Sequence, residues 1–273
     1  MINYGFKIFL SASKGANRLR KLRTPNLNTD YVSSVLQEYG IVITDVSIKP
    51  IKRNREGFVN FYYSIAGKVG DQQVQYFASK ADILVEPLLF GIYSPSLGFK
   101  YQLPRERKQK DFDDLTFLHQ NGVPSVQPVA FDRKGRMTVE LFEKGNALRT
   151  YLENPEYPED GKLELSRKAL LAIRGANSLG RYCPDTHTDN FFVTQDNGVI
   201  LTDMEMASSL EDGTHDLATF VYSAADNLDV RKLLILVREM YPVGTIRKLP
   251  QFSRYMRLVA GSRFRTAEAL SEV

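Results

Sequence analysis

The sequence has little of what marks a secreted or membrane protein. Its single cysteine, Cys183, cannot form an internal disulfide, which argues against a disulfide-stabilised secreted domain. Its most apolar early segment, residues 8–12, is far shorter than the roughly 20 residues of a membrane-spanning helix. No internal repeat and no low-complexity segment occurs. We therefore expect a globular protein of the cytoplasm.

What is present suits a protein with a real core. The chain has 273 residues, of which 43% are hydrophobic and 25% are charged. This composition excludes a disordered tail and a coiled coil, and the length suggests one large domain or two lobes.

Positive charge is concentrated at the N-terminus. The chain has 36 Lys and Arg against 32 Asp and Glu, and residues 1–23 hold six of the basic residues and no carboxylate. The rest therefore has 30 basic against 32 acidic residues, a net charge of −2. This basic arm could contact a polyanion such as nucleic acid, or a membrane surface, whereas the rest of the chain gives no such indication.

Three β-prone segments open the folded part of the chain. Residues 42–51, 58–69 and 73–83 are rich in Val, Ile, Tyr and Phe. A polar turn at residues 52–57 and the dipeptide Gly70-Asp71 separate them, so we expect a three-stranded meander.

Further elements follow in mixed order. Proline-rich residues 87–104 predict a loop insertion, and residues 105–120 a helix that ends at Asn121-Gly122. Beyond it we expect strands at 126–131, 136–142, 191–194 and 199–202, and helices at 146–153, 163–179, 214–227, 230–240 and 251–270. The fold class is therefore α+β, with an N-terminal extension over 1–40, a sheet-rich domain over 41–143 and a mostly helical domain over 144–273.

Three polar residues stand at the ends of consecutive elements. Asp185 opens a polar loop, Asn190 ends it at an apolar strand, and Asp203 follows the next strand. A hairpin of these strands would bring the three side chains together. Their oxygen atoms suit Mg²⁺, which prefers one or two carboxylates together with phosphate oxygens and water.

This stretch resembles the protein-kinase-like superfamily, whose catalytic loop reads H-x-D-x-x-x-x-N and whose metal-binding strand ends in D-F-G or D-x-E. Asn190 follows Asp185 by five positions, and Asp203 follows Asn190 by thirteen, as in the family. Cys183 stands in place of the histidine. A competing register that starts at His187 makes Asp189 the catalytic residue but puts Thr194 where the asparagine belongs.

The resemblance implies further residue roles. Asp216, in Asp-Leu-Ala, would brace the catalytic loop through its backbone. Lys80 on the third strand would bind the α- and β-phosphates of ATP, with Lys68 as a weaker alternative, and Asp111 on the following helix would pair with this lysine. Glu106 and Asp114 remain alternatives to Asp111.

The nucleotide's other contacts follow from the same resemblance. Backbone around Glu140 to Glu143 would meet the adenine. The first hairpin turn has one glycine, so Lys52, Arg53 and Arg55 would supply charge to the phosphates where the family uses glycine-rich backbone.

The resemblance implies an ATP- and Mg²⁺-dependent kinase with a two-lobed fold, nearest to RIO-like, lipopolysaccharide-kinase-like and aminoglycoside-phosphotransferase-like proteins. Asp185 would act on the acceptor hydroxyl, and Asn190 and Asp203 would hold the metal. Only 12 residues separate Asp203 from Asp216, which favours a small-molecule, glycolipid or atypical protein acceptor. Two alternatives remain open: a pseudokinase that binds nucleotide or partners without turnover, and a kinase tethered to nucleic acid by its basic arm.

Overall fold

The protein is described by a computed structural model that covers residues 27–51, 60–81, 104–183, 185–204 and 213–252. Its fold is mixed α+β, as the sequence predicts. The chain divides into two compact units. The first unit comprises residues 1–113 and 127–142, and the second comprises residues 114–126 and 143–273.

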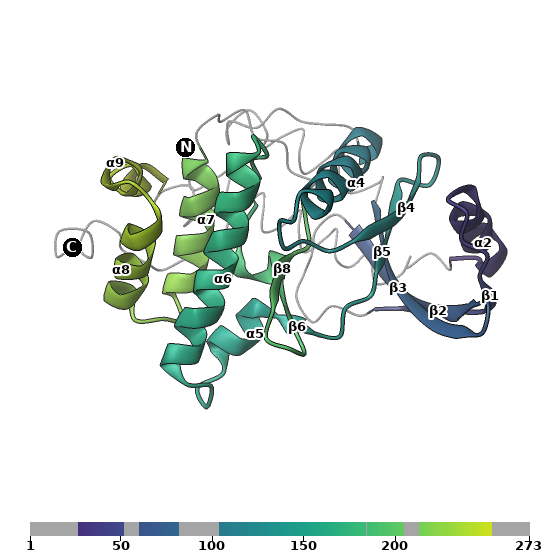
Figure 1. The fold of residues 1–273 in the computed structure, drawn as a ribbon, viewed down its shortest axis with the longest axis horizontal. Helices are drawn as coiled ribbons and strands as arrows, with labels where there is room; N and C mark the ends of the chain where they lie inside the picture. Colours follow the sequence, from purple (N-terminus) through teal and green to yellow (C-terminus); the bar gives the residue numbers. More distant parts are fainter. Residues whose placement is uncertain (1–26, 52–59, 82–103, 184, 205–212, 253–273) are drawn as a thin grey trace, which may run out of the picture. The chain divides into compact units, whose positions relative to one another are not determined.

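The first unit is built on a five-stranded antiparallel sheet with the strand order β1-β2-β3-β5-β4 (Figure 1). Strands β2 and β3 form a long hairpin that pairs without a shift, and Gly70 lies in its turn with φ +58°. A positive φ suits glycine, which has no Cβ to clash with the backbone. The strands are β1 (Thr44–Pro50), β2 (Asn60–Val69), β3 (Gln72–Ala81), β4 (Pro128–Asp132) and β5 (Met137–Leu141).

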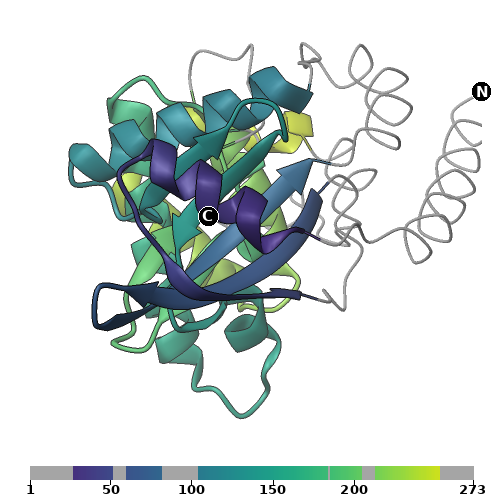
Figure 2. The same ribbon diagram turned by 90° about the vertical axis from the view of Figure 1, so that its right-hand side faces the viewer.

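Helix α2 (Thr29–Glu38) covers one face of this sheet, where Figure 2 shows it in front of the strands. The side chain of Asn28 caps the helix by accepting a hydrogen bond from the Asp30 N–H at 2.8 Å. Its apolar stripe joins a core with residues from four strands, namely Val32, Val35, Leu36, Tyr63, Ile65, Tyr76, Ala78, Ala130, Met137 and Val139. The segment expected as part of an extension over residues 1–40 therefore contributes a helix to this unit.

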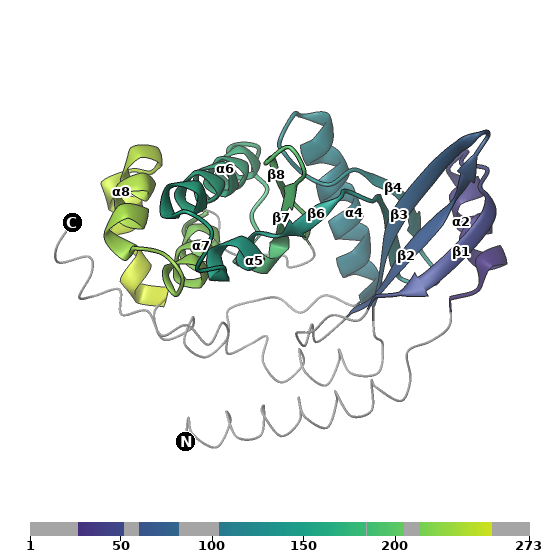
Figure 3. The same ribbon diagram turned by 90° about the horizontal axis from the view of Figure 1, so that it is seen from below.

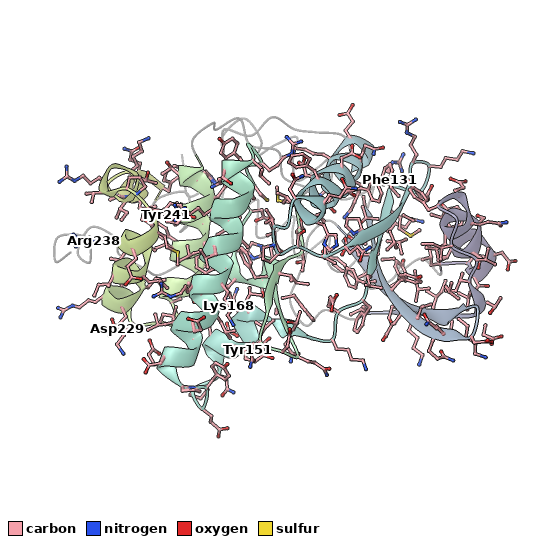
Figure 4. The ribbon with its side chains drawn as sticks, viewed as in Figure 1. Phe131, Tyr151, Lys168, Asp229, Arg238 and Tyr241 are labelled. Carbon is pink, nitrogen blue, oxygen red and sulfur yellow. The ribbon has the colours of Figure 1, made fainter. Side chains whose placement is uncertain are left out.

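Helix α4 (Pro104–Gln120) packs against the other face of the sheet. Its Phe112 ring lies 5.9 Å from the ring of Phe131 on β4, and Figure 4 labels Phe131 beside this helix. Phe131 pairs with Thr138, whereas its neighbours Ala130 and Asp132 point to the face that α2 covers. The two sheet faces differ in composition, because the α2 face buries Asp132 within a mainly apolar core whereas the α4 face carries several buried polar side chains.

The second unit combines a small antiparallel sheet with helices. The sheet pairs three strands in the order β6 (Gly145–Ala147), β7 (Phe191–Thr194) and β8 (Val199–Leu201). Figure 3 shows them beside helix α5. The helices are α5 (Leu148–Glu153), α6 (Glu159–Ser178), α7 (Thr214–Ala225), α8 (Val230–Met240) and α9 (Val243–Ile246), with 3-10 turns η1 (Thr188–Asn190) and η2 (Leu249–Phe252).

The core of the second unit also takes in the C-terminal part of α4. Leu115, Leu118, Val123 and Val126 lie in one buried cluster with α6, α7 and α8. Among the residues that the structure describes, no helix is both long and apolar enough to cross a membrane. The expected helix over 251–270 and the loop over 87–104 fall almost wholly outside the described residues.

Candidate active site

The loop after helix α6 is anchored by helix α7. Helix α6 ends at Ser178, and Gly180 with φ +70° turns the chain away from it. The backbone N–H of Cys183 then donates a 2.9 Å hydrogen bond to Oδ2 of Asp216, whose side chain is 1% exposed. Thr186 Oγ1 donates to the backbone carbonyl of the same residue. The predicted brace between Asp216 and the backbone of this loop is confirmed.

Asp185 and Asn190 are in direct contact within this loop. Asn190 Nδ2 donates to the Asp185 carbonyl at 2.7 Å and approaches Asp185 Oδ2 at 3.4 Å. Asn190 is 4% exposed and ends the 3-10 turn η1, just before β7. The amide therefore holds the loop closed and orients the Asp185 carboxylate.

Asp203 follows strand β8 and joins the same cluster. Thr202 donates from both its N–H and its Oγ1 to the carbonyl of Asn190, at 3.0 and 3.1 Å. The Cys183 Sγ–H donates to the Asp203 carbonyl at 3.5 Å. The hairpin of β7 and β8 therefore brings the polar loop and the end of β8 together, as the sequence predicts.

Cys183 lies at the centre of this arrangement. The side chain is 2% exposed, and burial raises the pKa of its thiol well above the ordinary value. The charges of Asp185, Asp216 and Asp203 raise the pKa further, in that order of size. Three carboxylates thus act on one thiol, which keeps it protonated and unsuited to be a nucleophile.

We expect Cys183 to resist thiol reagents in the native protein. Each unit by which the pKa rises lowers the thiolate fraction about tenfold at a given pH. Between pH 7 and 9 the thiol of the unfolded chain ionises near its ordinary pKa of about 8.5, whereas the native thiol stays protonated. Because the chain has one cysteine, absorbance after addition of an aromatic disulfide reports this thiol alone. Equal rates in native and denatured protein would contradict the buried placement.

His187 is a neighbour of Asp185 that the sequence analysis considered only as the start of the competing register. Its Nδ1 accepts a hydrogen bond from the Asp189 N–H at 3.3 Å, which assigns the proton of the neutral ring to Nε2. Nε2 lies 3.5 Å from Asp185 Oδ1. The signal was its position two residues after Asp185.

Asp189, the catalytic residue of the competing register, has different neighbours from Asp185. Asp189 Oδ2 lies 3.2 Å from a guanidinium nitrogen of Arg149 on helix α5, and Arg149 also pairs with Glu153 at 2.8 Å. The structure thus gives Asp189 a cationic partner, while Asp185 lies beside Asn190 and His187.

The loop and the end of β8 carry oxygen donors of the types that Mg²⁺ binds. Within the described ranges, no group of three or more His, Cys, Asp or Glu side chains is arranged to hold a metal ion. Mg²⁺ in phosphate-transfer sites keeps several waters and takes only one or two carboxylates from the protein. Asp203 offers one carboxylate and Asn190 one amide oxygen, which are donors of these types.

In the first unit, Lys80 and Asp111 have different neighbours. The Lys80 ammonium lies 6.0 Å from the ring centroid of Tyr31 on α2, and burial followed by the charge of Arg136 lowers its pKa. Asp111, on α4, lies 3.8 Å from the ammonium of Lys108. The structure brings Asp111 to Lys108, a residue that sequence reasoning did not consider.

The alternatives to these two residues have other surroundings. Lys68 forms an exposed ion pair with Asp45 at 2.7 Å, and its hydrogen bond to Asp45 raises its pKa. Asp114 pairs with Arg181 at 3.0 Å, and the Arg181 guanidinium stacks 4.3 Å from the ring centroid of Phe117. Glu106 is exposed at the start of α4.

Two backbone N–H groups of the segment expected to meet adenine, residues 140–143, form hydrogen bonds within the protein. The Leu141 N–H donates to the Gln127 carbonyl at 2.9 Å, and the Phe142 N–H donates to the Gln75 carbonyl at 3.1 Å. The Glu140 side chain is buried on the α4 face of the sheet, and Glu143 is half-buried. Lys52, Arg53 and Arg55 lie outside the described residues, as does the basic arm.

No family model matches this chain, and a search among curated proteins finds no match.

Proposed function

We propose that this protein is an ATP- and Mg²⁺-dependent phosphotransferase with a two-lobed, protein-kinase-like fold. The observation that carries the proposal is the contact of Asn190 with Asp185, made in a loop that also joins the end of β8 at Asp203. These residues have the spacing of a kinase catalytic loop, and their contacts are within the chain's second unit. The buried brace from Asp216 supports the same assignment.

The two-lobed fold is proposed from the elements of each unit. The first has an antiparallel sheet with one long helix between its third and fourth strands, and the second is mostly helical with a small hairpin. In this proposal the first unit binds the nucleotide. The second supplies the groups that act on the metal and the acceptor.

Each residue of the loop would have a separate task. Asp185 would accept the proton of the acceptor hydroxyl, because its carboxylate is half-exposed and oriented by Asn190. His187 Nε2 would donate to Asp185 Oδ1 and help to hold the carboxylate in one orientation. Asn190 and Asp203 would hold Mg²⁺, which supplies neutralisation of phosphate charge when bound.

The phosphates require a cation in the first unit as well. Sequence reasoning assigns this role to Lys80 with Asp111 as its partner, and the structure adds Lys108 as a second candidate. A lysine serves as a point charge for phosphate oxygens, and a nearby carboxylate keeps its ammonium in place.

The acceptor is proposed to be a small molecule, a glycolipid or a protein bound by an atypical kinase. The support is the short link of 12 residues between Asp203 and Asp216, which leaves little room for a peptide-binding segment. Residues 205–212 of this link are outside the described residues. We place the enzyme in the cytoplasm, where ATP is available, and its basic arm could add contact with a polyanion or a membrane surface.

The test is a thermal unfolding titration with ATP, with and without Mg²⁺. A ligand at 100 times its dissociation constant adds about 2.7 kcal/mol to stability, so Mg²⁺-ATP should raise the midpoint of the wild-type protein. Asp203→Asn should remove the Mg²⁺-dependent part. Asp196→Asn, in the turn between β7 and β8, is the matched control and should respond like the wild type.

Two outcomes would change the proposal. A wild-type protein that does not respond to Mg²⁺-ATP would contradict it. Stabilisation by Mg²⁺-ATP without ATP turnover, in the presence of candidate acceptors, would favour the pseudokinase alternative, which the replacement of the catalytic-loop histidine by Cys183 already suggests.

A further inference from the structure

We propose that Lys108 of helix α4, and not Lys80 of strand β3, is the lysine that binds the nucleotide phosphates. This inference rests on the proposed function and names the cation that the function requires. It starts from the faces of the five-stranded sheet, because adjacent residues of a strand point to opposite faces.

Lys80 belongs to the face that helix α2 covers. It pairs with Met137 on β5, and Met137 lies in the core that α2 shares with the sheet. Directly paired residues share a face, so Lys80 points to the same side. Its ammonium over the Tyr31 ring agrees with this placement, since Tyr31 is on α2.

Ser79 belongs to the opposite face, which helix α4 covers. It pairs with Thr138, and Thr138 pairs with Phe131, whose ring contacts Phe112 of α4. Glu140 lies on this face as well, because it is two residues from Thr138 and its carboxylate approaches the Thr138 hydroxyl at 3.5 Å. Helix α4, which carries Asp111, therefore faces Ser79 rather than Lys80.

Buried polar groups are gathered on this face. Ser79, Thr138 and Glu140 of the sheet are each at most 4% exposed. From α4, Lys108 is 0% exposed and Asp111 2%. Burying charges costs free energy that a well-packed apolar layer would avoid. The α2 face of the same sheet has a mainly apolar core in which Asp132 is buried, whereas the α4 face buries several polar and charged groups together, and this concentration points to a functional role.

Lys108 has the geometry of a held ammonium in this layer. Its Nζ donates to Ser79 Oγ at 2.6 Å and lies 3.8 Å from Asp111 Oδ2. Lys108 and Asp111 are three residues apart on one helix, so their pairing does not depend on the distance between helix and strand. The sequence predicts a lysine-carboxylate pair between β3 and α4. In the structure both members, Lys108 and Asp111, lie on α4, and the Lys108 ammonium contacts Ser79 on β3.

This placement suits phosphate binding. A phosphate oxygen would compete with Ser79 Oγ for a proton of the ammonium, while Asp111 keeps the ammonium in position. For Lys80, burial and the charge of Arg136 both lower the pKa and so disfavour the charged form.

The first test uses the wild-type protein and an acyl-phosphate derivative of ATP. The neutral lysine amine attacks the acyl carbon and forms an amide, the nitrogen loses a proton to water, and ATP leaves with the electron pair of the broken acyl–oxygen bond. Peptide mass spectrometry should then find the acyl group on Lys108, and an excess of ATP should suppress it. Acylation of Lys80 that ATP suppresses, or the absence of any ATP-sensitive acylation at Lys108, would overturn the inference.

The second test compares three lysine-to-methionine variants in the Mg²⁺-ATP titration. Lys108→Met should weaken apparent Mg²⁺-ATP affinity about 10- to 100-fold, the effect of losing one hydrogen bond to a charged group. Lys80→Met and Lys110→Met, the latter two residues along α4, should change it less than about twofold. Circular dichroism checks that each variant is folded, and the labelling experiment decides the matter if Lys108→Met is not.

The results separate this inference from the proposed function. If the wild type responds to Mg²⁺-ATP and Asp203→Asn does not, but Lys108→Met still responds normally, the kinase assignment stands and Lys108 is a structural buried lysine. If the wild type neither responds nor is labelled, the proposed function itself fails, and this inference fails with it.

Discussion

Replacing Asp185 by asparagine should lower the rate of ATP-dependent phosphoryl transfer by about 10²- to 10⁴-fold, the usual contribution of a general base. The asparagine amide cannot accept the proton of the acceptor hydroxyl. The loop should keep its shape, because the 2.7 Å hydrogen bond from Asn190 goes to the backbone carbonyl of residue 185. Steady-state turnover measures the loss, and the thermal midpoint shows whether Mg²⁺-ATP still binds.

Asp189→Asn is the matched control for this experiment. It makes the same chemical change four residues later, and it also tests the competing register of the motif. Asp189 faces Arg149 rather than the Asp185–Asn190 cluster, so its variant should keep turnover within a few-fold of the wild type. Loss of turnover in Asp189→Asn with full activity in Asp185→Asn would show that Asp189, and not Asp185, is the general base.

Asp216→Ala should destabilise the second unit and slow turnover together. Its carboxylate is buried and accepts the Cys183 N–H, so removing it leaves a buried donor without its acceptor. Hydrogen bonds to charged groups are worth about 1.5–3 kcal/mol, which corresponds to several degrees in the unfolding midpoint. Turnover should fall because Asp185 is two residues from the anchored backbone.

Asp226→Ala is the control for this experiment, because Asp226 lies at the opposite end of the same helix, α7. Asp226 is exposed at the C-terminal cap of α7, where a substitution should change stability by no more than about 0.5 kcal/mol. Differential scanning fluorimetry and turnover assays on both variants give the result. Equal midpoints for the two variants would show that the brace carries little of the unit's stability.

The fold could be predicted where local chemistry is decisive. The β-rich segments and the Gly70 turn predict strands β1 to β3, and the structure confirms them within a few residues. Helix α2 was missed, although Asn28 as a cap and the spacing of Val32, Val35 and Leu36 are signals of an amphipathic helix. These residues were assigned to an extension because of the basic segment that precedes them.

The contacts within the loop could be predicted from the sequence, whereas the direction of side chains on the sheet could not. Asp185, Asn190 and Asp203 are linked by short-range hairpin geometry, which spacing alone can predict. The direction of Lys80 could not be predicted, because Tyr76, Ala78 and Ser79 are all buried and β3 shows no alternation of polar and apolar residues there. Only the pairing with β5 and the two covering helices shows which face is which.

The division of the chain limits how this protein can be dissected. Residues 114–126 belong to the second unit, although residues 127–142 return to the first. A fragment that ends at residue 142 would keep Leu115, Leu118, Val123 and Val126 but lose the residues that bury them. Such a fragment would expose an apolar strip and aggregate, while the complementary fragment would have a hole in its core. During synthesis, likewise, strands β4 and β5 of the first unit emerge only after residues 114–126, which belong to the second unit.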